Sequence, residues 1–160
     1  GGFHIGNATP TSSMPSNVTA TYSGVFLGAA IDTGATRGMT ENGALAGVVN
    51  MTADFTKGSV DGRVSDIRQD GFLSTNVDIK MNGTISGSTY KGTASLVEAG
   101  TSTAVGTVTS SAHQGGFYGA GAAETAGAIC VEASGSNLGL PRFGNGTGTA
   151  IVGAYGAKKQ

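Results

Sequence analysis

Glycine is so frequent along this chain that long helices are disfavoured from the outset. The 160 residues include 29 glycines, and they do not follow the Gly-X-Y period of a collagen triple helix. Each glycine in a helix interior costs roughly 1 kcal/mol relative to alanine, and the many β-branched residues lose rotamer freedom there. Interspersed Val, Ile, Leu, Phe and Tyr still offer apolar surface to bury. We therefore expect one domain of β-sheet with many turns.

Alternation of apolar and polar residues marks the expected strands. In residues 76–85, for example, Val77, Ile79 and Met81 share one face, so this face should meet a core and the other face, which carries Asp78, should meet water. Eight segments of this kind are expected, at residues 18–27, 43–55, 59–65, 76–85, 89–97, 104–110, 125–131 and 148–156. The Gly- and Ala-rich residues 115–124 should interrupt the sheet between the sixth and the seventh.

The spacing of these segments predicts how they are arranged. Short strands joined by tight turns imply antiparallel neighbours. Eight such strands can close into an up-and-down barrel, which removes exposed sheet edges. The predicted fold is thus all-β, an eight-stranded antiparallel barrel filled by its own side chains.

The first sixteen residues differ from the rest. They contain two of the three prolines and show no periodic pattern, so we expect residues 1–16 to form an N-terminal arm or linker and residues 17–160 the barrel domain. No apolar stretch approaches the ~18 residues of a membrane helix, so no transmembrane segment is expected.

Charge and cysteine content limit the possible partners. Nine basic and ten acidic residues are spread singly and give a net charge of −1, which argues against nucleic acid or an anionic membrane as partner. The single cysteine, Cys130, cannot form an internal disulfide and lies in an apolar run, so we interpret it as a small buried hydrophobe.

Four short motifs occur in order along the expected barrel: Tyr22-Ser23-Gly24, Ala53-Asp54-Phe55, Phe117-Tyr118-Gly119 with Glu124 after it, and Tyr155-Gly156. In this order they resemble the β-barrel domain of the transferrin-binding protein B-like bacterial surface lipoproteins, a group that includes factor H-binding and haem-capturing relatives. Ala120 departs from the pattern, because the family often has proline there. The resemblance implies a scaffold role for the motif residues and a location outside the cell or on the bacterial outer-membrane surface.

The third motif has a physical interpretation of its own. Phe117 and Tyr118 can cap one end of a barrel, and Glu124 can accept backbone N–H bonds at the following turn. We expect a structural role for this carboxylate, not a catalytic one.

His4 and His113 are the only imidazoles. His113 follows a predicted strand and precedes Gly115, so an exposed loop position is expected. The haem-capturing relatives imply a further hypothesis, in which His113 is an axial haem ligand together with Tyr118 or His4. Haem is the one cofactor considered, and two histidines and one cysteine leave no metal cluster of recognised spacing.

Asp32-Thr33-Gly34 matches the active-site turn of aspartic proteases. Such catalysis needs two carboxylates that share a proton, so this chain would have to dimerise, with residues 151–153 as the apolar element near the C-terminus. That element lies much further along the chain than in small proteases of this kind. Asp-Thr-Gly is also a common way to end a strand, so we expect a turn and no enzyme.

The predicted function is a non-enzymatic binding module on the bacterial surface or secreted from the cell. It would engage a protein partner, host or self, through barrel-end loops at residues 32–42, 67–74 and 134–145, since loops on a rigid scaffold can vary without cost to the core. The alternative is a self-assembling structural subunit of a surface filament or layer. There, residues 1–16 would dock on a neighbouring copy as an added strand.

Overall fold

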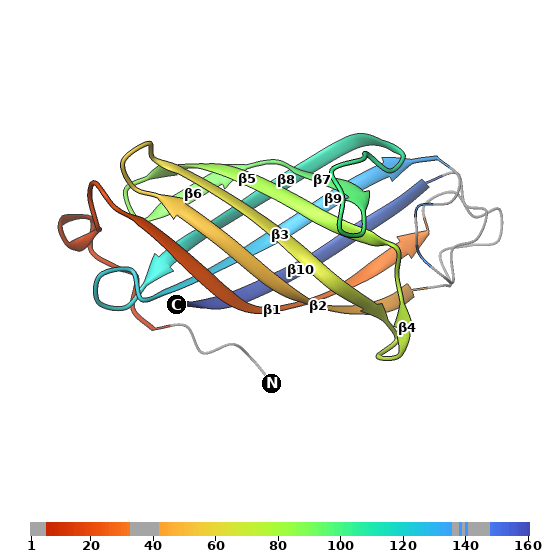
Figure 1. The fold of residues 1–160 in the computed structure, drawn as a ribbon, viewed down its shortest axis with the longest axis horizontal. Helices are drawn as coiled ribbons and strands as arrows, with labels where there is room; N and C mark the ends of the chain where they lie inside the picture. Colours follow the sequence, from red (N-terminus) through yellow and green to blue (C-terminus); the bar gives the residue numbers. More distant parts are fainter. Residues whose placement is uncertain (1–5, 33–41, 136–137, 139, 141–147) are drawn as a thin grey trace.

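The computed structural model describes residues 6–32, 42–135, 138, 140 and 148–160 (Figure 1). A 3-10 helix at Thr11–Ser13 precedes the sheet. The strands are β1 (Thr19–Asp32), β2 (Asn42–Asp54), β3 (Ser59–Gln69), β4 (Leu73–Ser74), β5 (Val77–Ser86), β6 (Thr89–Gly92), β7 (Ala94–Glu98), β8 (Thr107–Tyr118), β9 (Glu124–Ser134) and β10 (Gly148–Lys159).

These strands form the predicted closed, eight-stranded antiparallel barrel. Around the wall the order is β3, β2, β1, β10, β9, β8, β6 and β5, and β5 pairs back to β3 to close it. β6 and β7 act as two halves of one barrel strand, because both pair with β5. β4 is a two-residue extension that pairs with the end of β3.

The course of β8 corrects the sequence-based prediction. Residues 115–124 do not interrupt the sheet, because β8 continues through Gly115 to Tyr118 and β9 begins at Glu124. Only residues 119–123 turn the chain between them. β3 and β10 also extend beyond their predicted ends, to Gln69 and Lys159.

Side chains fill the barrel, and glycines in the wall give them room. The largest buried groups are the rings of Tyr22, Phe26, Tyr90, Phe117 and Tyr155. A Cβ on Gly153 would come within 2.4 Å of the Phe26 ring, so this ring packs against the wall at a position without a side chain. The filling also contains polar side chains, because His113 and Gln69 are buried among the apolar ones.

The strand ends fall into two groups, one at each end of the barrel (Figure 1). Antiparallel order places the last residues of β1, β3, β7 and β9 at one end of the barrel, where the described connections are residues 70–76 and 99–106. We call this the long-loop end. The turns at residues 55–58, 87–88 and 119–123 lie at the other end, together with the C-terminus.

The described part of the N-terminal arm packs on its own barrel at the short-turn end. Ala8 forms an isolated bridge with Tyr118. The backbone N–H of Thr9 donates to the carbonyl of Phe117 at 3.0 Å, and its hydroxyl donates to the carbonyl of Gly119 at 2.7 Å. Thr9 is buried as a result.

An ion pair on the outer wall overturns the prediction that Asp78 faces water. Asp78 is buried, and its Oδ2 accepts from Nε of Arg63 at 2.7 Å and from the N–H of Gly100 at 3.0 Å. Arg63 also donates to the carbonyl of Thr101 at 2.6 Å. This Arg63–Asp78 clasp therefore holds the connection between β7 and β8 against the wall.

Candidate functional site

The structure places His113 inside the barrel, so the predicted exposed loop position is wrong. His113 lies within β8, and only 1% of it is exposed. Its Nδ1 lies 2.7 Å from the carbonyl oxygen of Asn82 on β5. Its Nε2 lies 2.8 Å from the hydroxyl of Tyr155 on β10. The imidazole thus connects two strands that are not neighbours in the wall.

His113 ends a chain of buried hydrogen bonds. The hydroxyl of Tyr155 lies 2.6 Å from that of Tyr90, and the hydroxyl of Tyr90 lies 2.8 Å from that of Thr125. Thr125 in turn donates to the carbonyl of Gly116 at 2.9 Å. We call the side chains of Thr125, Tyr90, Tyr155 and His113 the interior polar chain.

The acceptor at one end fixes the proton positions along the interior polar chain. A carbonyl oxygen only accepts, so Nδ1 of His113 must carry the proton. In the neutral ring, Nε2 then accepts from the hydroxyl of Tyr155, and Tyr155 accepts in turn from Tyr90. The hydroxyls of Tyr155 and Tyr90 therefore each donate in one defined direction, whereas Thr125 has a single proton for two acceptors, the hydroxyl of Tyr90 and the carbonyl of Gly116.

Burial keeps the groups of the interior polar chain neutral. It lowers the pKa of His113, although the bond to the Asn82 carbonyl opposes this shift. Burial also raises the pKa of Tyr90 to about 12, and its hydrogen bonds with Thr125 and Tyr155 partly offset this shift. The pKa of Tyr155 is raised for the same reason, and further by Tyr90 beside it.

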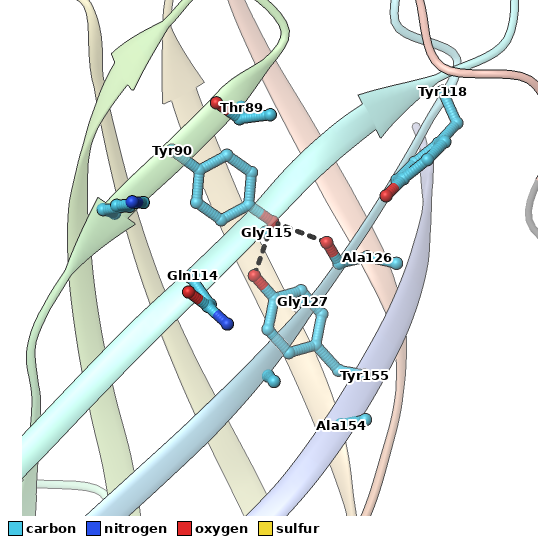
Figure 2. Close-up of a pocket in the computed structure, with 11 residues that line it drawn as sticks. Thr89, Tyr90, Gln114, Gly115, Tyr118, Ala126, Gly127, Ala154 and Tyr155 are labelled. Carbon is cyan, nitrogen blue, oxygen red and sulfur yellow. Dashed lines mark hydrogen bonds between the residues drawn. The ribbon is translucent and has the colours of Figure 1, made fainter.

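Two glycines make room for this arrangement. One register row crosses four strands in the order Tyr90, Gly115, Gly127 and Tyr155. A Cβ on Gly115 would lie 2.3 Å from the Tyr90 hydroxyl, and one on Gly127 would lie 2.6 Å from the Tyr155 hydroxyl. The two rings therefore reach over the glycines and meet between them, as Figure 2 shows.

Above this row lies a shallow pocket (Figure 2). Lys91, Gln114 and Tyr118 contribute side chains, and small residues such as Ala128 and Ala154 form much of the remaining lining. Lys91, Gln114, Ala128 and Ala154 form one register row of exposed residues, so the pocket opens on the outer wall.

The haem hypothesis requires groups that the structure keeps apart. Tyr118 and His113 are five positions apart on one strand, so their side chains lie on opposite faces of the wall. Nε2 of His113 is already paired with Tyr155 inside the barrel. His4 lies outside the described residues. Iron ligation by His113 would thus require the interior polar chain to open.

The motif residues have structural roles at the short-turn end. The hydroxyl of Tyr22 donates to the carbonyl of Ala122 at 2.8 Å and so fixes the turn between β8 and β9. Burial raises the pKa of Tyr22 to about 12. Asp54 accepts from the backbone N–H groups of Thr56 and Lys57 at 3.0 and 2.9 Å, and this forms the turn after β2.

The third motif fulfils only part of its predicted role. Phe117 is fully buried and packs on Phe55, with ring centroids 5.2 Å apart. Tyr118 points to the outer wall, so it does not cap the barrel together with Phe117. Glu124 lies within β9, where its carboxylate is 3.9 Å from Nζ of Lys158.

Gly24, in the first motif, has its α-carbon against β10, where a Cβ would meet the carbonyl of Gly156 at 2.0 Å.

At the long-loop end, the predicted loop at residues 67–74 is the one that the structure describes best. Its first three residues, 67–69, belong to β3, so the connection itself is residues 70–76. Asp70 and Gly71 have positive φ angles of 54° and 83° and make its turn. The next residue, Phe72, is 66% exposed, the highest exposure among the large apolar side chains of the described residues. The other two predicted binding loops, at 32–42 and 134–145, lie mostly outside the described residues.

The protease motif falls at the end of β1. Asp32 is the last residue of this strand and pairs with Thr149, whereas residues 33–34 lie outside the described part. The proposed apolar element, residues 151–153, is the centre of β10 and pairs with residues 28–30 of β1. Because these residues form the barrel wall, they are not available as a separate dimerisation element.

Within the described ranges, no group of three or more His, Cys, Asp or Glu side chains could hold a metal ion. No helix in the same part of the chain has the length and apolar character needed to cross a membrane. Cys130 is half-buried on the outer face of β9, not fully buried as its apolar neighbours suggested.

Comparison with known proteins identifies relatives of this barrel. A family model described as the C-lobe and N-lobe β-barrels of Tf-binding protein B matches residues 14–159. No curated protein matches the chain.

Several solved structures share the fold. Intact Ap-TbpB, with its N and C lobes, has a TM-score of 0.61 and 20% sequence identity over 97% of this chain. A TbpB mutant from Haemophilus parasuis Hp5 has a TM-score of 0.62 and 19% sequence identity over 96% of this chain. Isotype 1 TbpB from serogroup B Neisseria meningitidis has a TM-score of 0.57 and 20% sequence identity over 96% of this chain. This chain spans less than a third of each of theirs, 29%, 29% and 28% respectively.

Proposed function

The chain belongs to the family of β-barrel domains found in the C and N lobes of transferrin-binding protein B, and we propose that it is a non-enzymatic module that binds a protein partner on the bacterial surface. The long-loop end is the proposed binding face. The observation that carries this proposal is that the longer described connections, residues 70–76 and 99–106, both lie at this end of the barrel, above an interior filled by side chains.

Phe72 is the residue of the described loops best suited to anchor a partner. A large apolar ring that is 66% exposed beside a turn gains free energy when a partner covers it, and aromatic residues dominate binding energy at protein interfaces. The turn at Asp70 is tied to β2 by two bonds with Ala44, at 2.7 and 3.2 Å. Phe72 therefore lies next to a turn that hydrogen bonds hold against β2.

Transferrin is the first partner to test, because two of the related structures carry it in their names. The experiment measures binding of purified vertebrate serum transferrins to the immobilised chain. Phe72→Ser should weaken binding by about tenfold or more, the equivalent of roughly 1.4 kcal/mol. Val18→Ser is the matched control, since Val18 is also exposed, at 49%, but adjoins the short-turn end. Equal affinities of the two variants would contradict the proposed face.

Haem binding is not part of the proposal, because His113 is engaged on both ring nitrogens. Titration with hemin tests this directly. We expect no Soret shift that depends on His113, so a shift that disappears in His113→Ala and persists in Tyr118→Phe would restore the hypothesis.

Self-assembly through residues 1–16 stays a prediction. The described part of this arm already pairs with its own barrel through Ala8 and Thr9, which leaves it fewer free backbone groups for a neighbouring copy. Deletion of residues 1–16 with measurement of molar mass decides between the two functions. An assembly that falls apart on deletion would favour the structural subunit.

A further inference from the structure

The shallow pocket on the outer wall has no part in the proposed function. Its volume is about 460 Å³, which is within the range of ligand sites in proteins. The lining comes from β6, β8, β9 and β10, and its polar side chains include those of Thr89, Lys91, Gln114 and Tyr118. We call this hollow the outer-wall pocket.

Small residues make the floor of the outer-wall pocket flat. Gly115 pairs with Gly127 across β8 and β9, and Ala128 pairs with Ala154 across β9 and β10. No side chain longer than a methyl group therefore rises from this part of the floor. These residues lie inside regular ladders, which use their backbone N–H and C=O groups. The floor thus offers apolar contact and few hydrogen bonds.

Polar and aromatic side chains stand at the rim of the pocket. Lys91 and Gln114 lie opposite each other on β6 and β8, and both are exposed. Tyr118 lies further along the outer face of β8. Its ring lies back over Gly116, where an added Cβ would be 3.3 Å from the hydroxyl. Gln114 and Tyr118 therefore flank the floor from its two ends along β8 (Figure 2).

The rim side chains are available to a ligand. Within the described part of the chain, no hydrogen bond or ion pair occupies the side chains of Lys91, Gln114 and Tyr118. Lys91 is the one charged residue in the lining. Glu124, on the outer face of β9 beyond the pocket, lies 3.9 Å from Nζ of Lys158. The outer-wall pocket is therefore positively charged, which favours an anion.

The floor and the rim together select one class of ligand. A cation would meet no carboxylate in the lining. A sugar has hydroxyls around its ring, and those over the floor would lose water without gaining hydrogen bonds. An aromatic ring has no such groups, so it can lie flat on the floor with its edge near Tyr118. A carboxylate on this ring accepts hydrogen bonds from ammonium and amide groups such as those of Lys91 and Gln114.

We propose that the outer-wall pocket binds small aromatic carboxylates. The ring lies on the floor formed by Gly115 and Gly127, and the carboxylate accepts from Lys91 and Gln114 at the rim. The site does not involve Phe72 or the long-loop end, so it is independent of the proposed protein partner. Because the pocket is shallow and the ligand small, the expected Kd is on the order of 1 mM.

The probe is phenylacetate, added to the isotope-labelled whole chain and followed by amide chemical shifts. Shifts at residues 114–115 and 126–128 should saturate with a Kd on the order of 1 mM. Phenylacetamide, which has no charge, and phenethylamine, which is a cation, should bind about threefold more weakly or less tightly still. Three results would overturn the proposal: no saturable shift at these residues, equal affinity for the three compounds, or shifts centred on residues 70–73.

Removal of the rim charge tests the position of the carboxylate. Lys91→Gln should weaken phenylacetate binding by about threefold, since an exposed ion pair contributes modestly, and should leave phenylacetamide binding unchanged. Lys80→Gln is the matched control, because Lys80 is an exposed lysine on β5 outside the lining. An equal loss in both variants would mean that the anion responds to net charge alone and would contradict the assigned contact.

A larger side chain on the floor tests the position of the ring. Ala128→Leu places an isobutyl group where the ring should lie, so it should abolish the shifts caused by phenylacetate. Ala128 is exposed on the outer wall, and the amide spectrum of the variant shows whether the fold is kept. Ala44→Leu is the control, because Ala44 is an exposed alanine on β2, away from the pocket. Unchanged binding to Ala128→Leu would place the ligand elsewhere and overturn the proposal.

Discussion

The hydroxyls of Tyr90 and Tyr155, 65 residues apart in the sequence, lie 2.6 Å from each other inside the barrel. Their rings meet because Gly115 and Gly127 provide space beneath them. The pair forms the middle of the interior polar chain and links β6 to β10 across the two strands between them. It therefore contributes to holding together the wall that carries the proposed binding face at the long-loop end.

Gly127→Ala should destabilise the barrel. The added methyl would lie 2.6 Å from both the Tyr155 hydroxyl and the Gln114 carbonyl, and the backbone carbonyl cannot move without disturbing the sheet. We expect a loss of roughly 1–3 kcal/mol in the free energy of unfolding, measured by urea denaturation. Gly6→Ala is the control, since nothing lies within 4 Å of the new methyl. Equal stability of the two variants would contradict the claim that Gly127 makes room for the ring of Tyr155.

Tyr155→Phe should lower the free energy of unfolding by about 1–3 kcal/mol. The substitution removes the hydroxyl that donates to Nε2 of the buried His113 and accepts from Tyr90. Tyr118→Phe removes the same hydroxyl from a half-buried ring on the outer wall, so it should change stability by less than about 0.5 kcal/mol. Thermal or urea unfolding of both variants provides the comparison. A smaller loss for Tyr155→Phe than for Tyr118→Phe would refute the role of the interior polar chain.

The lowered pKa of His113 predicts a loss of stability in acid. Above pH ~6.5 the imidazole is neutral in both states and contributes no pH dependence. Below pH ~6.5, His113 binds a proton in the unfolded chain but stays neutral in the folded barrel, where its pKa is lower. The free energy of unfolding therefore falls as the pH falls, by up to about 1.4 kcal/mol per pH unit.

Urea midpoints measured between pH 7 and pH 5 test this dependence. His113→Gln removes the titrating ring, so its stability should change less steeply than that of the wild type over this interval, whatever its absolute value. Parallel curves for the two proteins would show that His113 is not the group responsible.

The Arg63–Asp78 clasp should stabilise the barrel and its β7–β8 connection. Asp78→Asn removes the carboxylate that accepts hydrogen bonds from Arg63 and Gly100. We expect the free energy of unfolding to fall by roughly 1–3 kcal/mol and the amide of Gly100 to exchange faster. The control is Asp66→Asn, because the Asp66–Arg68 pair is exposed and 3.9 Å apart and should contribute less than about 1 kcal/mol.

The sequence allowed the barrel to be predicted because its strands are marked by local patterns. Alternation in residues 76–85 and the turn signals around Gly58 and Gly71 depend only on nearby residues, and the structure has strands and turns there. The closed order follows from these elements, since antiparallel neighbours and tight turns leave few other arrangements.

The interior polar chain could not be predicted, because it depends on register between distant strands. Gly115 resembles a loop signal when read beside His113, yet its function is to make room for Tyr90 on another strand. Asp78 was assigned to water from alternation alone. Its burial depends on Arg63, which pairs with Lys80 and thus lies diagonally across from Asp78.

The location of the partner on the barrel is tested most directly by hydrogen exchange of the chain with and without a bound transferrin. The proposed function predicts slower exchange at residues 70–73 of the long-loop end. Protection confined to residues 56–58, 87–88 and 119–123, at the opposite end, would contradict it.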